Sequence, residues 1–166
     1  TGIAQIVRDA RILPIYEGTN GIQAMDLVVR KIIGDKGLAI NELIVDMRKS
    51  LSSLLPGSPL LSSQIDRFKG SVDDLEKTVS LLLKHSTNMK FSGSVAFDVL
   101  MMTSTITAAW QMLVSVERAQ LAFESNKVSS EFFDDKTTTA QYFIDSILPR
   151  YVGHFITISS TDTGVK

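Results

Sequence analysis

Apolar residues recur three and four positions apart through almost the whole of this 166-residue chain. A sustained alternation of apolar and polar residues, which is the pattern of a half-buried strand, is nearly missing. The glycines and prolines stand at wide intervals between the periodic segments, where they are expected to end helices. The sequence therefore predicts an all-α fold.

Four long periodic segments, joined by short connections, occupy the chain from about Leu38 to Ser160. Short connections place consecutive helices side by side in opposite directions, so we expect an up-and-down antiparallel four-helix bundle. Pro149 lies inside the fourth segment and is expected to kink it. The apolar stripes run from Ile40 to Leu54, Ile65 to Leu82, Val95 to Val116 and Phe133 to Ile158.

Two shorter helices are predicted before the bundle. The first, 1–11, stops ahead of Pro14, which disfavours helix in the residue before it. The second follows Thr19 or Asn20, either of which can cap it with its side chain, and ends at Gly34. Its apolar stripe is predicted to be Ile22, Met25, Val29 and Ile32. The turn from Gly34 to Gly37 is the expected boundary between two parts, residues 1–35 and 36–166.

Composition narrows the classes of partner. Seventeen basic and eighteen acidic residues leave a net charge of −1, and no basic block is present to neutralise a row of phosphates, so nucleic acid is not expected. The absence of cysteine excludes disulfides and thiol chemistry. No apolar run reaches the roughly 20 residues that span a bilayer. We therefore expect a cytoplasmic protein, of bacterial origin, and, because the chain begins without Met, a piece of a longer one.

The segment from Arg8 to Gln23, RDARILPIYEGTNGIQ, places the carboxylate of Glu17 beside Gly18 on a turn before a helix. A Glu that is partly desolvated by apolar neighbours holds its proton more tightly and becomes a better general base. A solvated carboxylate that stabilises the dipole of the following helix fits the same pattern. The pattern alone leaves both interpretations open.

Residues Arg8 to Thr19 also resemble, without a gap, the segment of the acyl-CoA dehydrogenase family that carries the catalytic glutamate. The resemblance implies that Glu17 is the catalytic base that removes the α-proton of an acyl-CoA thioester while the β-hydrogen leaves as hydride to FAD. It also implies that the Glu17 N–H and Gly18 contact the substrate. Thr19, and Gly21 through its backbone, match positions that contact FAD.

The continuation from Asn20 to Val28, NGIQAMDLV, is similar to the long members of this family, which append an extra helical domain to the catalytic core. The resemblance implies that residues 1–35 are the end of the catalytic helical domain and that residues 36–166 are the accessory domain. Such a fragment is expected to be inactive alone and to bind no FAD. For the intact enzyme the resemblance implies a homo-oligomer and an electron-transferring flavoprotein as electron acceptor.

A second hypothesis is a non-catalytic helical bundle that assists subunit assembly or substrate access.

The other chemically notable residues favour structural roles. His85 and His154 lack a clear carboxylate partner in the sequence and make a poor metal site, so no metal is expected. The group Asp73, Asp74 and Glu76 is predicted to form a solvated helix face. Met101, Met102, Met112 and Trp110 could line an acyl pocket, but packing in the core or at an interface is the preferred interpretation. Phe132 and Phe133 either staple the last helix or dock it onto the catalytic core.

Overall fold

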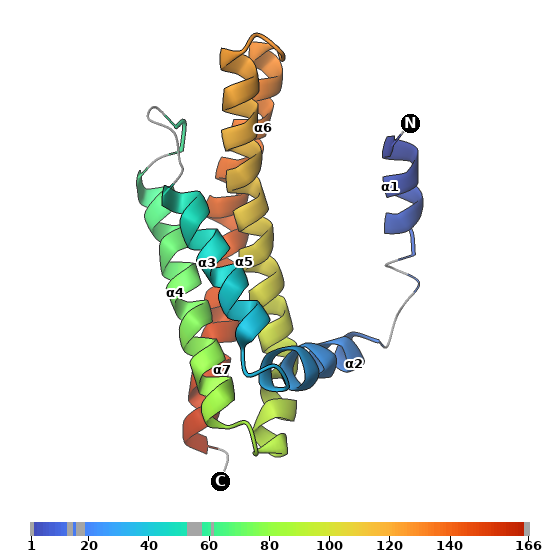
Figure 1. The fold of residues 1–166 in the computed structure, drawn as a ribbon, viewed down its shortest axis with the longest axis vertical. Helices are drawn as coiled ribbons and strands as arrows, with labels where there is room; N and C mark the ends of the chain where they lie inside the picture. Colours follow the sequence, from blue (N-terminus) through green and yellow to red (C-terminus); the bar gives the residue numbers. More distant parts are fainter. Residues whose placement is uncertain (1, 13–14, 16–18, 53–57, 61, 165–166) are drawn as a thin grey trace.

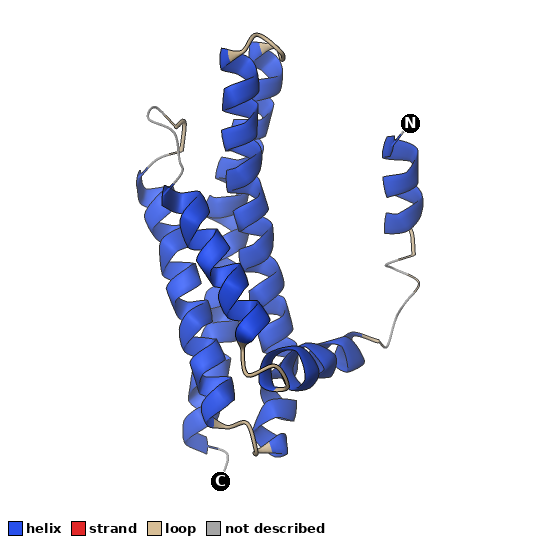
Figure 2. Cartoon of the chain, in the orientation of Figure 1, coloured by secondary structure: helices blue, strands red, loops and turns tan. Residues whose placement is uncertain are grey.

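A computed structural model describes residues 2–12, 15, 19–52, 58–60 and 62–164, and it confirms the all-α prediction (Figures 1 and 2). No strand is present in these described ranges. The bundle consists of α3 (Leu38–Ser52), α4 (Ser62–Lys84), α5 (Met89–Glu124) and a composite fourth helix. That fourth helix comprises α6 (Ser130–Tyr142), the π-helical η2 (Phe143–Ile147), the 3-10 turn η3 (Leu148–Arg150) and α7 (Tyr151–Gly164). Consecutive members of the bundle run in opposite directions (Figure 1).

At Pro149, where a kink is predicted, the helix changes type from the π-helical η2 to the 3-10 turn η3. Pro149 has no N–H, so it cannot donate to the carbonyl of Ile144, which a π-helical N–H at this position would bond. Arg67 of α4 supplies a donor instead, with its Nη1 at 3.4 Å from that carbonyl oxygen. The same guanidinium forms an ion pair with the carboxylate of Asp145. Arg67 therefore donates to the backbone carbonyl that Pro149 leaves without its regular N–H donor.

Helix α5 is the centre of the bundle and packs against α2, α3, α4, α6 and α7. The side chains of its predicted stripe are buried: Val95, Val99, Met102, Ile106, Ala109, Leu113 and Val116. Trp110 lies beside this stripe and donates from Nε1 to Ser50 Oγ of α3 at 2.8 Å. By length and composition α5 could also cross a membrane, yet 39% of its most apolar stretch is buried within the bundle. The buried side of α5 is thus the core of this fold.

The segment before the bundle contains α1 (Gly2–Ala10), α2 (Asn20–Met25) and the π-helical η1 (Asp26–Ile33). The predicted stripe of the second helix is wrong in part, because Ile22 is 69% exposed and the buried side chains are Ala24, Val28 and Ile32. Residues four apart lie on one face of a helix, so these three side chains form one stripe that is offset from the predicted one. Through these side chains α2 and η1 share the core of the bundle.

Helix α1 buries none of its residues and stands away from the bundle (Figure 1). Its apolar side chains Ile3, Ile6 and Val7 are exposed. The strongly amphipathic pattern of α1 therefore has no packing partner among the described residues.

The neighbouring residues Met101 and Met102 offer a direct test of this core. Met102 is fully buried, whereas the adjacent Met101 is 38% exposed. We expect Met102→Ala to lower the free energy of unfolding by about 2–5 kcal/mol, because it leaves a cavity. Met101→Ala is the matched control and should cost less than about 1 kcal/mol. Equal losses in urea denaturation would contradict the assigned burial.

Candidate functional site

The residues predicted to carry the chemistry fall into two groups. Glu17 and Gly18 lie outside the described residues, so their structure stays a prediction. Thr19 and Gly21 are described and lie at the start of α2, immediately after them in the chain. Thr19 is half-buried and Gly21 is exposed.

Thr19 occupies the N-cap position of α2, but the prediction that its side chain caps the helix is wrong. Its backbone is helical, with φ −92° and ψ −11°, whereas side-chain capping requires an extended N-cap residue. The first bond instead joins the N–H of Gln23 to the carbonyl oxygen of Thr19 at 2.8 Å. Side-chain capping of α2 therefore does not explain why residue 19 is a threonine.

Gly21 leaves its backbone open to an approaching group. A Cβ built at this position would meet nothing within 4 Å, so the glycine is not required by packing within the described chain. A residue without a side chain lets a ligand approach the main chain closely. The predicted backbone contact of Gly21 with a cofactor stays a prediction.

Both histidines face aspartates on other elements, which corrects the prediction that they lack carboxylate partners. His85 Nε2, after the end of α4, lies 2.5 Å from Asp162 Oδ1 of α7. His154 Nδ1 of α7 lies 2.8 Å from Asp98 Oδ1 of α5. No group of three or more potential metal ligands occurs in the described part of the chain. The two pairs therefore attach α7 to its neighbours.

The acidic group on α4 is also not simply a solvated face. Asp74 is half-buried and accepts hydrogen bonds from the Tyr151 hydroxyl at 3.1 Å and from Lys77 Nζ at 2.8 Å. Burial, followed by the charge of Asp74, raises the pKa of Tyr151 to about 12. The hydrogen bond to Asp74 is also the main cause that raises the pKa of Lys77. Asp74 thus stabilises the contact between α4 and α7.

The other two acidic residues of this group join α4 to α3. Arg48 Nη2 of α3 lies 2.9 Å from Asp73 Oδ1 and 2.7 Å from Glu76 Oε2. Their side chains are well exposed, so each pair contributes at most about 1 kcal/mol. These charges align the two helices without forming a reactive centre.

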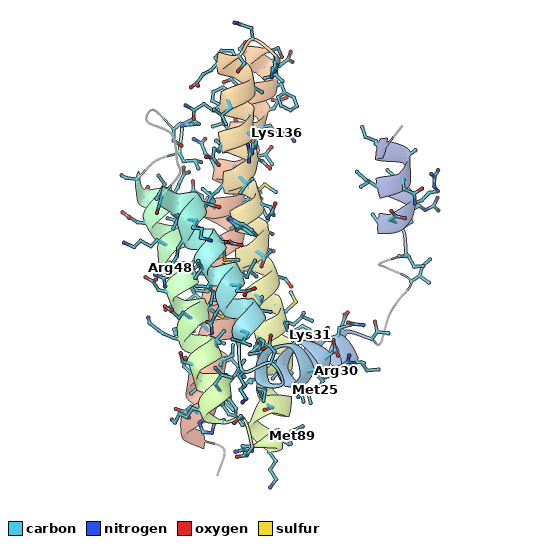
Figure 3. The ribbon with its side chains drawn as sticks, viewed as in Figure 1. Met25, Arg30, Lys31, Arg48, Met89 and Lys136 are labelled. Carbon is cyan, nitrogen blue, oxygen red and sulfur yellow. The ribbon has the colours of Figure 1, made fainter. Side chains whose placement is uncertain are left out.

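The remaining candidates have mainly structural roles. Met102 belongs to the core, as the preferred interpretation predicts, and Trp110 is held by its hydrogen bond to Ser50. Phe133 stacks on Phe123 of α5 with ring centroids 5.4 Å apart, which staples the start of α6 to the end of α5. Phe132 stays exposed beneath Lys136, which lies near the tip of the α5–α6 hairpin (Figure 3).

Residues 40–165 match the protein family described as "Acetyl-CoA dehydrogenase C-terminal like". The chain therefore belongs to this family of acyl-CoA dehydrogenase C-terminal domains. The matched range covers α4, α5, the composite fourth helix and nearly all of α3, so the family is defined by the bundle.

Two relatives extend the comparison beyond the bundle. The chain is 33% identical, over 99% of its length, to the 3-methylmercaptopropionyl-CoA dehydrogenase of Ruegeria pomeroyi. It is 27% identical, over 89% of its length, to the broad-specificity linear acyl-CoA dehydrogenase FadE5 of Mycobacterium tuberculosis. The chain spans only 28% and 25% of the lengths of these two relatives.

The link between His85 and Asp162 predicts a dependence of stability on pH. The hydrogen bond from His85 is the main cause that lowers the pKa of Asp162, and Lys84 adds to it against the opposing effect of burial. A carboxylate whose pKa is lower in the folded state than in the unfolded state stabilises the protein above the unfolded-state pKa. This stability is lost as the pH falls through the folded-state pKa. Asp162→Asn should therefore be less stable than the unmodified chain at neutral pH.

This difference in stability should shrink below about pH 4, where the unfolded-state carboxylate takes up its proton. Urea unfolding across the acidic range measures it, with Asp66→Asn on the exposed surface of α4 as the control. A difference that stays constant on acidification would show that the charge of Asp162 does not stabilise α7.

Proposed function

We propose that this chain is the C-terminal part of an FAD-dependent acyl-CoA dehydrogenase, which catalyses the α,β-dehydrogenation of an acyl-CoA thioester. Residues 1–35 are the end of its catalytic helical domain, and residues 36–166 are an accessory bundle. The observation that carries the proposal is the run from Arg8 to Thr19, joined in one chain to a helical domain of this family. The similarity to the Ruegeria enzyme covers 99% of the chain and so includes this run.

In this proposal Glu17 takes the α-proton of the substrate. The α-proton of a thioester is weakly acidic, so a carboxylate base needs hydrogen-bond donors at the thioester oxygen to stabilise the negative charge that develops there. The N–H of Glu17 is one such donor, and Gly18 keeps the backbone close to the acyl-CoA. FAD, when bound, supplies the acceptor for the hydride that leaves the β-carbon.

Thr19 and Gly21 are proposed to hold the cofactor. The open surroundings of Gly21 support this role, because nothing in the described chain blocks an approach to its backbone. Both residues are positioned by α2, whose Ala24 is buried in the bundle core.

The intact protein is proposed to act as a homo-oligomer in the bacterial cytoplasm and to pass its electrons to an electron-transferring flavoprotein. The 166-residue chain is proposed to be inactive alone. Family membership supports the class of reaction and leaves the acyl group open, because the two relatives are named for different substrates.

The second candidate function is a non-catalytic role of the bundle in subunit assembly or substrate access. The links of Arg48, Asp74, His85 and His154 stabilise the bundle itself, which supports a structural role for these residues. The two functions are compatible in one protein, with the chemistry near Glu17 and the assembly role in residues 36–166.

Replacing the proposed base tests the catalytic proposal. In the full-length enzyme, Glu17→Gln should lower acyl-CoA oxidation by at least about 100-fold, because the amide cannot accept the α-proton. FAD and acyl-CoA should still bind to the variant. Glu42→Gln, at an exposed position of α3, should retain normal turnover. Normal turnover of the Glu17 variant would exclude the proposed role.

Cofactor content tests the proposal that this chain is a fragment. We expect the purified 166-residue chain to be colourless, because the domains that make most FAD contacts in this family are not part of it. Its visible absorbance after incubation with FAD and gel filtration measures this. Stoichiometric bound flavin would contradict the fragment interpretation.

A further inference from the structure

The outer face of α5, opposite the core, carries no charge over half of the helix, from Val99 to Val116. From Val99 to Val116 the sequence contains no Asp, Glu, Lys, Arg or His. A helix side that only meets water normally carries charged residues. On this side Phe97 is 51% exposed and Met101 is 38% exposed. We call the outer seam the residues Phe97, Met101, Ser104, Ala108 and Gln111.

The outer seam has the spacing of a helix-packing surface. Its residues follow one another by alternating steps of four and three, which keeps them in line along one side of a helix. Ser104 and Ala108 lie between the larger side chains and are small enough to let another helix approach closely. The buried side of α5 already uses a similar spacing to pack against its neighbours in the bundle.

Three hydroxyls on and beside the outer seam donate their hydrogen bonds within α5 itself. Ser104 Oγ donates to the carbonyl of Leu100 at 2.7 Å, and Thr105 Oγ1 donates to that of Met101 at 2.8 Å. Ser115 Oγ donates to the carbonyl of Gln111 at 2.7 Å. Burying a hydroxyl is costly only when it loses its hydrogen bond. A partner can therefore cover these hydroxyls without leaving them unpaired.

A second surface that no described residue covers lies on α1, and it indicates which partner covers the outer seam. Helices α2 and η1 pack on α5, and their residues Met25 and Lys31 lie near the Met89 end of that helix (Figure 3). Beyond them α1 stands on the side of the bundle where α5 lies (Figure 1). A helix of nine residues is marginal alone in water, so α1 needs a partner for Ile3, Ile6 and Val7.

We infer that the outer seam of α5 is an interface that packs against a helix of the catalytic part of the same polypeptide. This inference rests on the proposed function, in which α1 belongs to that catalytic part. The two relatives are about four times as long as this chain. In a protein of that length, the catalytic part is large enough to cover both α1 and the outer seam.

A lipid surface fits the seam less well. Helices that lie on membranes combine large apolar side chains with Lys and Arg on the polar face. The seam contains Ser104, Ala108 and Gln111, and α5 has no Lys or Arg between Lys90 and Arg118. Small residues and an absence of charge suit close contact with another helix.

Methionine oxidation tests this interface with an internal control. Peroxide oxidises methionines according to their exposure. In the 166-residue chain Met101, on the seam, and Met89, outside it, are both exposed, whereas Met102 is buried. We expect Met101 to be oxidised about tenfold more slowly in the full-length polypeptide than in this chain, at every protein concentration. Met89 calibrates the oxidant, and peptide mass spectrometry measures each site.

Three results would overturn the inference. Met101 could be oxidised equally fast in both polypeptides. It could be protected in the 166-residue chain in proportion to protein concentration, which would assign the seam to a second copy. It could be protected only by added anionic vesicles, which would assign the seam to a membrane. If acyl-CoA oxidation depends on Glu17 while Met101 stays unprotected, the inference fails and the proposed function stands.

A charge placed on the seam provides an independent readout. Ser104→Glu should lower the thermal midpoint of the full-length polypeptide by several degrees and leave that of the 166-residue chain nearly unchanged. Ser80→Glu is the matched control, because Ser80 is also exposed and donates to the carbonyl four residues earlier, on α4. Equal effects of the two substitutions in the full-length polypeptide would contradict the interface.

Discussion

The packing of α5 through the middle of the bundle is the interaction on which the rest of the structure depends. Its buried side contacts every other bundle helix and also receives α2 and η1. The polar links of α7 rely on this arrangement, since His154 reaches Asp98 of α5 and Tyr151 reaches Asp74 of α4 only when α7 lies against both helices. These links fix the orientation of α7. The stability of its contact with α4 and α5 comes mainly from the burial of apolar side chains.

Much of this fold could be predicted because helical periodicity is a local property of the sequence. The bundle helices and the buried stripe of α5 are confirmed. At Pro149 the helix changes type, and the predicted kink stays a prediction. The buried face of the second short helix was predicted only in part. Ile32 is buried as expected, but Ala24 and Val28 are buried and Ile22 is exposed, because helical spacing alone does not decide which of two adjacent stripes meets the core. The partners of His85 and His154 were missed because they lie 77 and 56 residues away in the chain, which no local pattern reveals.

The candidate site depended on a different kind of information. A carboxylate beside a glycine before a helix is common, so Glu17 and Gly18 were singled out by their resemblance to one family. The structure adds the position of the next residues in the chain, since Thr19 and Gly21 begin a helix that is docked on α5 through Ala24. The bundle thereby holds the element next to the proposed base. If Glu17 is the base, as proposed, this connection would let the bundle help to position it, and the catalytic and assembly hypotheses would then apply to one arrangement.

The central claim is that Glu17 removes the α-proton of an acyl-CoA, and hydrogen exchange at that carbon tests it most directly. Full-length enzyme is incubated in deuterated water with an acyl-CoA analogue that cannot lose its β-hydrogen, and the recovered thioester is weighed by mass spectrometry. We predict that the unmodified enzyme introduces deuterium at the α-carbon and that Glu17→Gln introduces none above the uncatalysed rate. Undiminished exchange in the variant would show that another group is the base.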